Sequence, residues 1–128
     1  MDFLSSNSML LMQKSMDFLW TKQAAISDNI ANAETPNYKA KVVTFEENLR
    51  EKLEQALSSN TPRVSARRVI RDSEISVMEA AESTRMDGNG VNTTEQMVEL
   101  VRNAYQLQYV MNSISTDLAT LRIAVRGQ

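Results

Sequence analysis

The sequence lacks cysteine and histidine altogether. Their absence excludes disulfide bridges, thiol nucleophiles, Cys/His zinc sites and every catalytic triad that uses histidine. No phosphate-binding glycine loop and no nucleophile elbow occurs either. We therefore predict a protein that is not an enzyme and that binds no metal or other cofactor. The missing cysteines leave the compartment open, because such a chain is indifferent to redox state.

Glycine, proline and aromatic residues are few. The 128 residues include 3 glycines, 2 prolines, 1 tryptophan, 3 phenylalanines and 3 tyrosines. An all-β protein would need more glycine and proline for its tight turns. The length is enough for one domain with a modest core, and we expect that domain to be mainly α-helical.

Long hydrophobic runs and a strong net charge are also missing. No segment reaches the roughly 20 apolar residues that span a bilayer, and the N-terminus lacks the basic start of a Sec-type signal peptide. The net charge of -2 provides no bulk attraction to nucleic acid. Residues 41–86 carry 16 of the 30 charged side chains, which predicts a solvated middle and terminal segments that partners bury.

The first 33 residues predict a long helix. Their apolar residues recur at alternating spacings of three and four, as in a coiled-coil seam. The helix must end before Pro36, because the proline ring disfavours a helical conformation at Thr35. The predicted seam comprises Met9, Met12, Met16, Leu19, Gln23, Ile26, Ile30 and Ala33.

Residues 93–126 predict a second long helix. Asn92 with Glu95, or Thr93 with Gln96, would begin it by N-capping. The same three-four spacing holds over nine positions, and glycine follows as a C-terminal stop. The predicted helix-packing seam comprises Met97, Leu100, Ala104, Leu107, Met111, Ile114, Leu118, Leu121 and Val125.

Two heptad helices at opposite ends of the chain favour an antiparallel coiled coil, with an ordinary helical bundle as the alternative. Both helices carry further apolar rows beside the seam, and such rows need additional partners. We expect residues 1–40 and 93–128 to form one structural domain. Residues 41–92 would form a small, partly irregular middle region.

Within the middle region, residues 44–57 predict a short helix with Thr44 and Glu47 as a capping box. Residues 58–63 predict a loop. A short, imperfect alternation of apolar residues over 64–77 predicts weak strands around a turn at Asp72 and Ser73.

Three other groups of polar residues have simpler explanations than a binding site. The arginine cluster could bind phosphate or nucleic acid, but it lacks interleaved aromatic residues and favours a solvated surface. The glutamate cluster would lie on the solvated face of a helix. The stretch "DGNG" begins like a calcium loop without its later ligands, and with the residues around it at 86–92 it favours a tight turn. The clusters are Arg63, Arg67, Arg68 and Arg71, and Glu46, Glu47, Glu51 and Glu54.

The stretch "NIANAETPNYKA", residues 29–40, closely resembles the signature of flagellar basal-body rod and hook proteins. In that family a helix runs into Asn-Ile/Leu-Ala-Asn-Ala, followed by Thr-Pro-Gly-Tyr and a basic residue. Asn37 stands where glycine is commoner, and asparagine tolerates positive φ better than most residues. The matching residues are Asn29, Ile30, Ala31, Asn32, Ala33, Thr35, Pro36, Tyr38 and Lys39.

Within that family, the short length of the chain and the sequence of its C-terminal helix resemble those of two related proximal rod proteins. The resemblance implies a structural subunit that polymerises into the proximal rod of the flagellar basal body, in the periplasmic space. It implies export through the flagellar type III apparatus. The implied partners are that apparatus, other rod subunits, and membrane-ring and adaptor proteins of the basal body. The matching signature residues would act as a subunit-interaction motif.

Two other function classes remain open. A helical adaptor or chaperone would bind a partner's helix and would be a folded monomer or dimer at low concentration. A nucleic-acid-binding protein would use the arginine cluster and would bind in a salt-sensitive manner.

Overall fold

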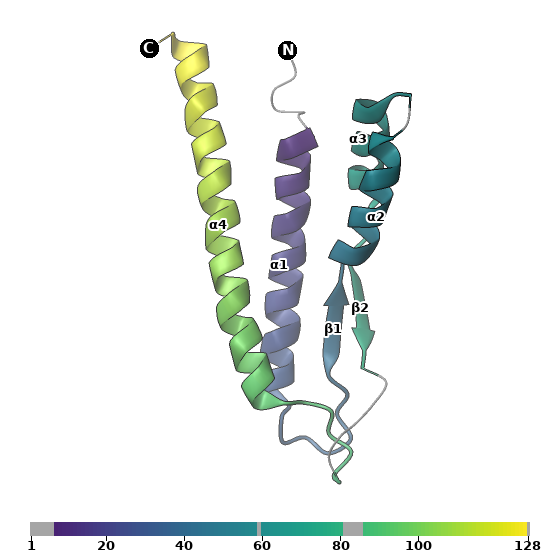
Figure 1. Ribbon diagram of the computed structural model, residues 1–128. Coiled ribbons are helices and arrows are strands. Elements are labelled where there is room, and N and C mark those ends of the chain that lie inside the picture. The colour runs from purple at the N-terminus through teal and green to yellow at the C-terminus, as the bar shows by residue number, and fades with distance from the viewer. Residues whose placement is uncertain (1–6, 59, 81–85, 128) are drawn as a thin grey trace.

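The computed structural model describes residues 7–58, 60–80 and 86–127. Two long helices, α1 (Asn7–Ala31) and α4 (Thr93–Arg126), run side by side in opposite directions, and the smaller elements lie on the other side of α1 (Figure 1). The expected mainly α-helical fold, with paired terminal helices, is confirmed. The elements in chain order are α1 (Asn7–Ala31), β1 (Lys41–Thr44), α2 (Glu46–Leu57), α3 (Pro62–Asp72), β2 (Ser76–Glu79) and α4 (Thr93–Arg126).

Local sequence signals determine both ends of α4. The side chain of Asn92 accepts a hydrogen bond from the backbone N–H of Glu95 at 3.4 Å, as predicted for one of the two possible N-caps. Gly127 adopts a left-handed conformation with φ of 71° and donates its N–H to the carbonyl oxygen of Ile123 at 3.0 Å. These caps satisfy backbone groups that a helix end leaves unpaired.

The middle region is a two-stranded antiparallel ribbon that carries a pair of helices. Lys41 lies opposite Glu79, and Thr44 lies opposite Ser76. Helices α2 and α3 connect these two strands and pack against each other. The strand expected near residue 77 is thus present as β2. Its partner strand β1 was not predicted from the sequence.

Two expectations about the middle region are wrong. Residues 62–72 form helix α3 instead of a loop end and a weak strand, because Ala66, Val69 and Ile70 recur at helical spacing and line one buried or half-buried side. Thr44 ends strand β1 and does not cap α2. The N-cap residue of α2 is Phe45, and no side chain makes a capping hydrogen bond there.

The main hydrophobic core lies where α1, α2 and α4 meet. Its buried members are Phe18, Leu19, Phe45, Leu49 and Leu107. The rings of Phe18 and Phe45 stack with their centroids 5.3 Å apart. Each such side chain contributes about 1.5–3 kcal/mol when fully buried, so this small cluster supplies much of the packing free energy.

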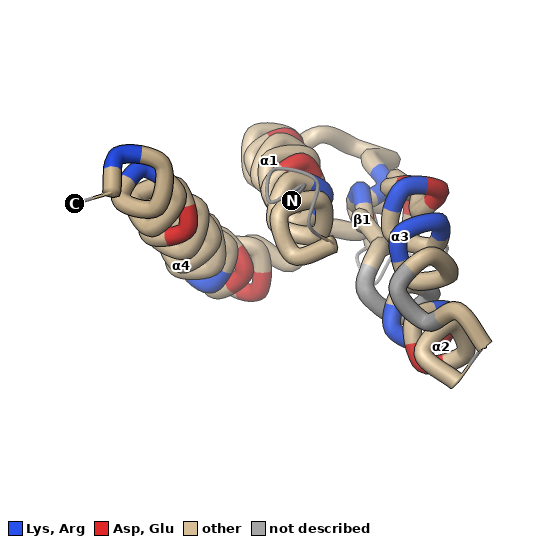
Figure 2. Tube along the Cα trace, turned by 90° about the horizontal axis from the view of Figure 1, so that it is seen from above, with Lys and Arg blue, Asp and Glu red and all other residues tan. Residues whose placement is uncertain are grey.

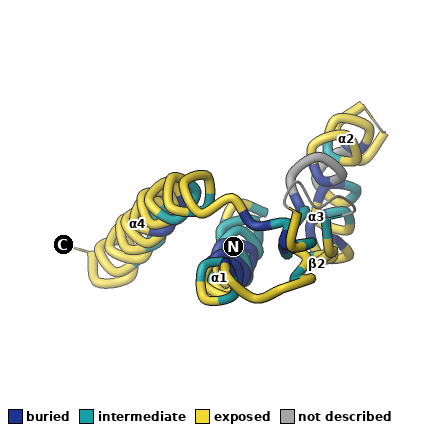
Figure 3. The backbone as a smooth tube through the Cα atoms, turned by 90° about the horizontal axis from the view of Figure 1, so that it is seen from below, coloured by how far each residue is buried: buried dark blue, intermediate teal, exposed yellow. Residues whose placement is uncertain are grey.

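Seen along the helices, the molecule is bent. Figures 2 and 3 show α1 at the apex, with α4 on one side and the α2–α3 pair on the other. Figure 3 also shows α4 exposed over most of its length, whereas α1 is buried over much of its inner part. The long C-terminal helix therefore contacts the rest of the chain through a narrow strip.

Candidate functional site: the signature loop and the surface of α4

The signature begins inside α1 and continues through a tight turn. Helix α1 ends at Ala31, and the N–H of Thr35 then bonds to the carbonyl oxygen of Asn32 at 3.0 Å. Asn37 takes the left-handed conformation with φ of 59°. This geometry explains how asparagine can stand at a position where the related signature more often has glycine.

Asn29 holds the end of α1 against the start of β1. Its side chain is 1% exposed. Its Nδ2 donates to the carbonyl oxygen of Lys41 at 2.9 Å and to Oε1 of Gln96 at 3.0 Å. Its Oδ1 accepts from the N–H of Lys41 at 2.7 Å and from the hydroxyl of Tyr38 at 3.3 Å. One buried amide thus joins α1, the signature turn, β1 and α4.

A second buried amide, Asn89, holds the turn itself. Asn89 is 0% exposed. Its Nδ2 donates to the carbonyl oxygens of Asn32 at 3.0 Å and Thr35 at 2.8 Å, and its Oδ1 accepts from the N–H of Val91 at 2.7 Å. The sequence interpretation missed this residue. The tight turn predicted around it was the available signal, because turn asparagines often bond to backbone groups.

Backbone contacts complete the attachment of the signature to residues 86–92. The N–H of Asn37 donates to the carbonyl oxygen of Asp87 at 3.1 Å, and the N–H of Gly90 donates to that of Tyr38 at 3.0 Å. Gly88 has φ of 74°, and a Cβ at this position would lie 2.6 Å from Oδ1 of Asn37. The predicted turn is therefore confirmed, and it forms the surface on which the signature rests.

The nine matching signature residues divide into an inner and an outer group. Asn29 and Ala33 are buried, and Ile30, Asn32 and Tyr38 are half-buried. Tyr38 packs against the buried cluster of Ala33, Ala40 and Val91 within its own chain. Four members of the signature are exposed, namely Ala31, Thr35, Pro36 and Lys39. These four are the signature residues best placed to meet another molecule.

The predicted seam of α4 divides in a similar way. Leu107 is buried, and Leu100, Ile114 and Leu121 are half-buried. The alternate positions are exposed, namely Met97, Ala104, Met111, Leu118 and Val125. That the nine residues form one helix-packing seam stays a prediction.

Buried polar residues determine which side of α4 faces α1. Asn103 is buried, and its Nδ2 donates to the carbonyl oxygen of Leu19 at 3.0 Å and to Oε1 of Gln23 at 2.7 Å. With the Asn29–Gln96 bond, this gives two amide pairs between the helices. A hydrophobic pattern takes no account of such pairs, although they fix which side of a helix faces its partner.

Two groups of ion pairs lie in the same elements and shift pKa values, namely Glu99 with Lys22 and Arg102, and Asp28 with Lys41. Glu99 accepts from Nζ of Lys22 at 2.9 Å and from Nη1 of Arg102 at 2.6 Å. The hydrogen bond from Lys22, supported by both positive charges, lowers the pKa of Glu99 below its usual value. Nζ of Lys41 lies 2.7 Å from Oδ2 of Asp28, and this hydrogen bond, followed by the charge attraction, raises the pKa of Lys41.

In the described part of the structure, the residues of the arginine and glutamate clusters do not converge on a site. Arg67, Arg68 and Arg71 are exposed on α3, and Arg71 pairs with the neighbouring Asp72 at 3.3 Å. The side chains of Arg63, Glu46 and Glu47 lie outside the described part of the structure. Glu51 and Glu54 are exposed, and Glu54 pairs with Arg50 at 3.1 Å. Among the described residues, no helix is both long and apolar enough to cross a membrane.

Known proteins share both the signature and most of the remaining sequence of this chain. The family described as "Flagella basal body rod protein" matches residues 20–39, which include the end of α1 and the signature turn. The flagellar basal body rod protein FlgB of Borrelia hermsii is 30% identical over 91% of this chain and 93% of its own length. This chain belongs to the FlgB family of flagellar basal body rod proteins.

Other FlgB proteins extend the similarity. FlgB of Bacillus subtilis (strain 168) is 29% identical over 83% of each chain. FlgB of Yersinia enterocolitica is 26% identical over 90% of this chain and 85% of its own length. FlgC, the second proximal rod protein that the sequence left open, is not favoured by these matches.

Proposed function

We propose that this FlgB-family chain is a structural subunit that polymerises into the proximal rod. That part of the flagellar basal body transmits torque from the membrane ring to the distal rod and hook. The observation that carries the proposal is the exposed apolar surface of α4. This 34-residue helix buries only Asn103 and Leu107 within the chain. A helix of this length with uncovered apolar rows requires further partners.

The composition of α4 supports contacts between identical subunits. No charged residue occurs in residues 103–116. Tyr105 and Tyr109 are 70% and 73% exposed, and Met97 is 55% exposed. Tyrosine and methionine are enriched at the cores of protein interfaces, where charged residues are depleted. Identical copies can therefore approach along this helix without repulsion between like charges.

In this proposal the signature has two roles. Its inner residues hold the turn on the 86–92 loop, and its exposed residues Ala31, Thr35, Pro36 and Lys39 contact neighbouring subunits. Those neighbours would be other rod subunits and the membrane-ring and adaptor proteins at the rod base. The role is structural and requires no catalysis.

Export through the flagellar type III apparatus into the periplasmic space is part of the same proposal. A subunit that crosses a narrow channel unfolded needs a monomer that opens readily. The hydrophobic core around Phe18 and Phe45 is small, and the α1–α4 contact contains buried amides. Both features limit the stability of the isolated chain.

The test is to replace the chromosomal gene with a tagged copy and to image purified basal bodies. We expect the label at the membrane-proximal end of the rod and a loss of motility when the gene is deleted. A chain that remains a folded dimer outside the basal body, bound to another protein's helix, would favour the adaptor or chaperone function instead.

A further inference from the structure

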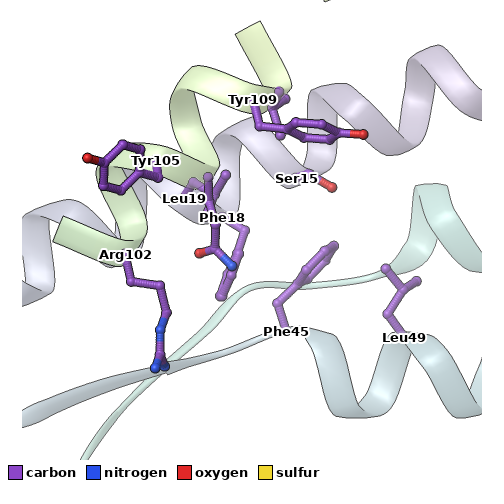
Figure 4. A pocket seen from close by; sticks show the side chains of 10 residues that line it. Ser15, Phe18, Leu19, Phe45, Leu49, Arg102, Tyr105 and Tyr109 are labelled. Carbon is purple, nitrogen blue, oxygen red and sulfur yellow. The ribbon is translucent and has the colours of Figure 1, made fainter. Parts of the chain in front are cut away.

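The concave side of the bent molecule contains a hollow of about 520 Å³. Phe18, Phe45 and Leu49 line it from α1 and the start of α2, and Tyr105 and Tyr109 line it from α4 (Figure 4). Its volume lies in the range of about 300–1,000 Å³ that is typical of ligand pockets. Its surface is mainly apolar, and tyrosine is one of the residue types that dominate binding energy at interfaces.

The other side of the α1–α4 pair has a second hollow, lined by apolar residues and by Gln23, Gln108 and Asn112. Trp20, the single tryptophan, is 52% exposed there. It lies with Ala104 and Met111 around this smaller hollow of about 370 Å³. Gln106 lines the first hollow and Gln108 lines the second. Two residues are about 200° apart around an α-helix, so the hollows open to opposite sides of the pair.

We propose that copies of this chain nest, with the convex side of one copy seated in the concave side of the next. Trp20 of one copy would enter the hollow formed by Phe18, Phe45 and the two tyrosines of its neighbour. This inference rests on the proposed function, because it requires neighbouring copies in one assembly.

Three observations favour a second copy as the occupant. The backbone is bent, with α1 at the apex (Figures 2 and 3), and the half-exposed Trp20 lies on the other side of the α1–α4 pair from the larger hollow. The uncharged stretch 103–116 supplies residues to both surfaces, so identical copies meet there without like charges. Trp20 of one copy is 52% exposed and Tyr105 and Tyr109 of the next are 70% and 73% exposed, so their contact would bury large aromatic side chains, the residue type that dominates interface energetics.

The two surfaces differ, so the contact is heterologous. A heterologous contact that does not close into a ring continues as a helical assembly. A contact between two copies of the same surface would instead stop at a dimer. Nesting therefore gives a rod subunit a way to add copies in one direction.

The absence of cysteine allows a direct test by cross-linking. Gln106→Cys and Gln108→Cys each introduce a single thiol at an exposed position, one on each side of α4. Both variants are treated with a short bis-maleimide, singly and as an equimolar mixture. The treatment is applied to the purified chain at high concentration and to basal bodies from cells that express both. We expect the mixture to give cross-linked dimers at least tenfold more efficiently than either variant alone.

A matched pair of substitutions tests the occupant of the hollow. Trp20→Ala should reduce the cross-linked yield at least tenfold, whereas Trp20→Phe should retain most of it. Assembly of the unmodified chain should shift the emission of Trp20 to shorter wavelength.

Efficient cross-linking of either variant by itself would overturn nesting, because the copies would then meet through the same surface. If the chain is present in basal bodies but the mixture gives no cross-link, nesting is wrong and the rod function stands. If the chain never enters basal bodies, the rod function fails together with nesting.

Discussion

The side-chain amide of Asn89 lies 2.8 Å from the carbonyl oxygen of Thr35, across 54 residues of sequence. The same Nδ2 lies 3.0 Å from the carbonyl oxygen of Asn32. These carbonyl groups lie in the signature turn after the end of α1, and each also accepts a backbone N–H, from Thr35 and Tyr38 respectively. A single asparagine before α4 thus completes the hydrogen bonding of the signature.

Replacing Asn89 by alanine should destabilise the chain markedly. The change removes three hydrogen bonds and leaves the N–H of Val91 without this acceptor, whereas the carbonyl oxygens of Asn32 and Thr35 still accept from the N–H groups of Thr35 and Tyr38. A lost hydrogen bond costs about 0.5–1.5 kcal/mol and an unpaired buried group about 1–3 kcal/mol, so we expect a loss of about 2–4 kcal/mol. Urea unfolding followed by circular dichroism measures it. Asn112→Ala, at an exposed position on α4, is the control and should change stability by less than about 0.5 kcal/mol. An unchanged unfolding midpoint for Asn89→Ala would refute the role assigned to this residue.

Replacing Gln23 and Asn103 together by leucine should stabilise the isolated chain. Among the described residues, Oδ1 of Asn103 is a buried atom without a hydrogen-bond partner. Polar residues inside a helix seam cost stability and specify register, so we expect a gain of about 1–2 kcal/mol. The single change Asn103→Leu should gain less, because it removes the donor that Gln23 uses. A double variant less stable than the natural chain would contradict this account of the seam.

The Lys22–Glu99 pair should make stability depend on pH at the acid side. The pKa of Glu99 is lowered in the folded chain, so its contribution is present above the ordinary glutamate pKa. That contribution is lost as the pH falls through the lowered value. Lys22→Met should remove about 0.2–1 kcal/mol at neutral pH, an amount typical of partly exposed pairs. It should also flatten the pH dependence of the unfolding free energy between about pH 5 and pH 3.

The more exposed pair of Arg50 and Glu54 is the control for this effect. Their side chains are 84% and 66% exposed, compared with 24% and 25% for Lys22 and Glu99. Arg50→Met should therefore change the unfolding free energy at neutral pH by less than Lys22→Met does. Equal effects of the two substitutions would show that the α1–α4 pair has no special electrostatic role.

Aspartate substitutions on α4 should separate folding from assembly. Leu107 is 8% exposed in the core, and a charge there costs several kcal/mol, so Leu107→Asp should unfold the chain. Met111 is 41% exposed, so Met111→Asp should leave the unfolding free energy within about 1 kcal/mol and still prevent incorporation into rods. Circular dichroism of the purified variants and a motility assay measure the two effects. Normal motility with Met111→Asp would show that the exposed apolar row of α4 that contains Met111 is not needed for assembly.

Local signals in the sequence determined the two long helices and the turns between them. The residues of α1 include no glycine or proline, and α4 has an asparagine cap and a glycine stop at its two ends. Such signals act over a few residues and are visible without tertiary context. The signature "NIANAETPNYKA" likewise indicated the rod family, because its characteristic residues follow one another in the sequence and can be recognised without the structure.

The tertiary structure alone decided which surfaces are buried. Helical spacing showed that α4 has adjacent apolar rows, but not which of them faces α1. The hydrogen bonds of Asn103 and Gln96 with α1 determine the side that faces inward. The tertiary structure also determined that residues 62–72 form a helix. The imperfect alternation over 64–77 predicted strands, whereas α3 forms there and packs against α2. The attachment of Asn89 to Thr35 depends on bringing the end of α1 next to the loop before α4. Contacts between residues far apart in the chain carry no local pattern, and they determine here which apolar rows of α4 remain exposed.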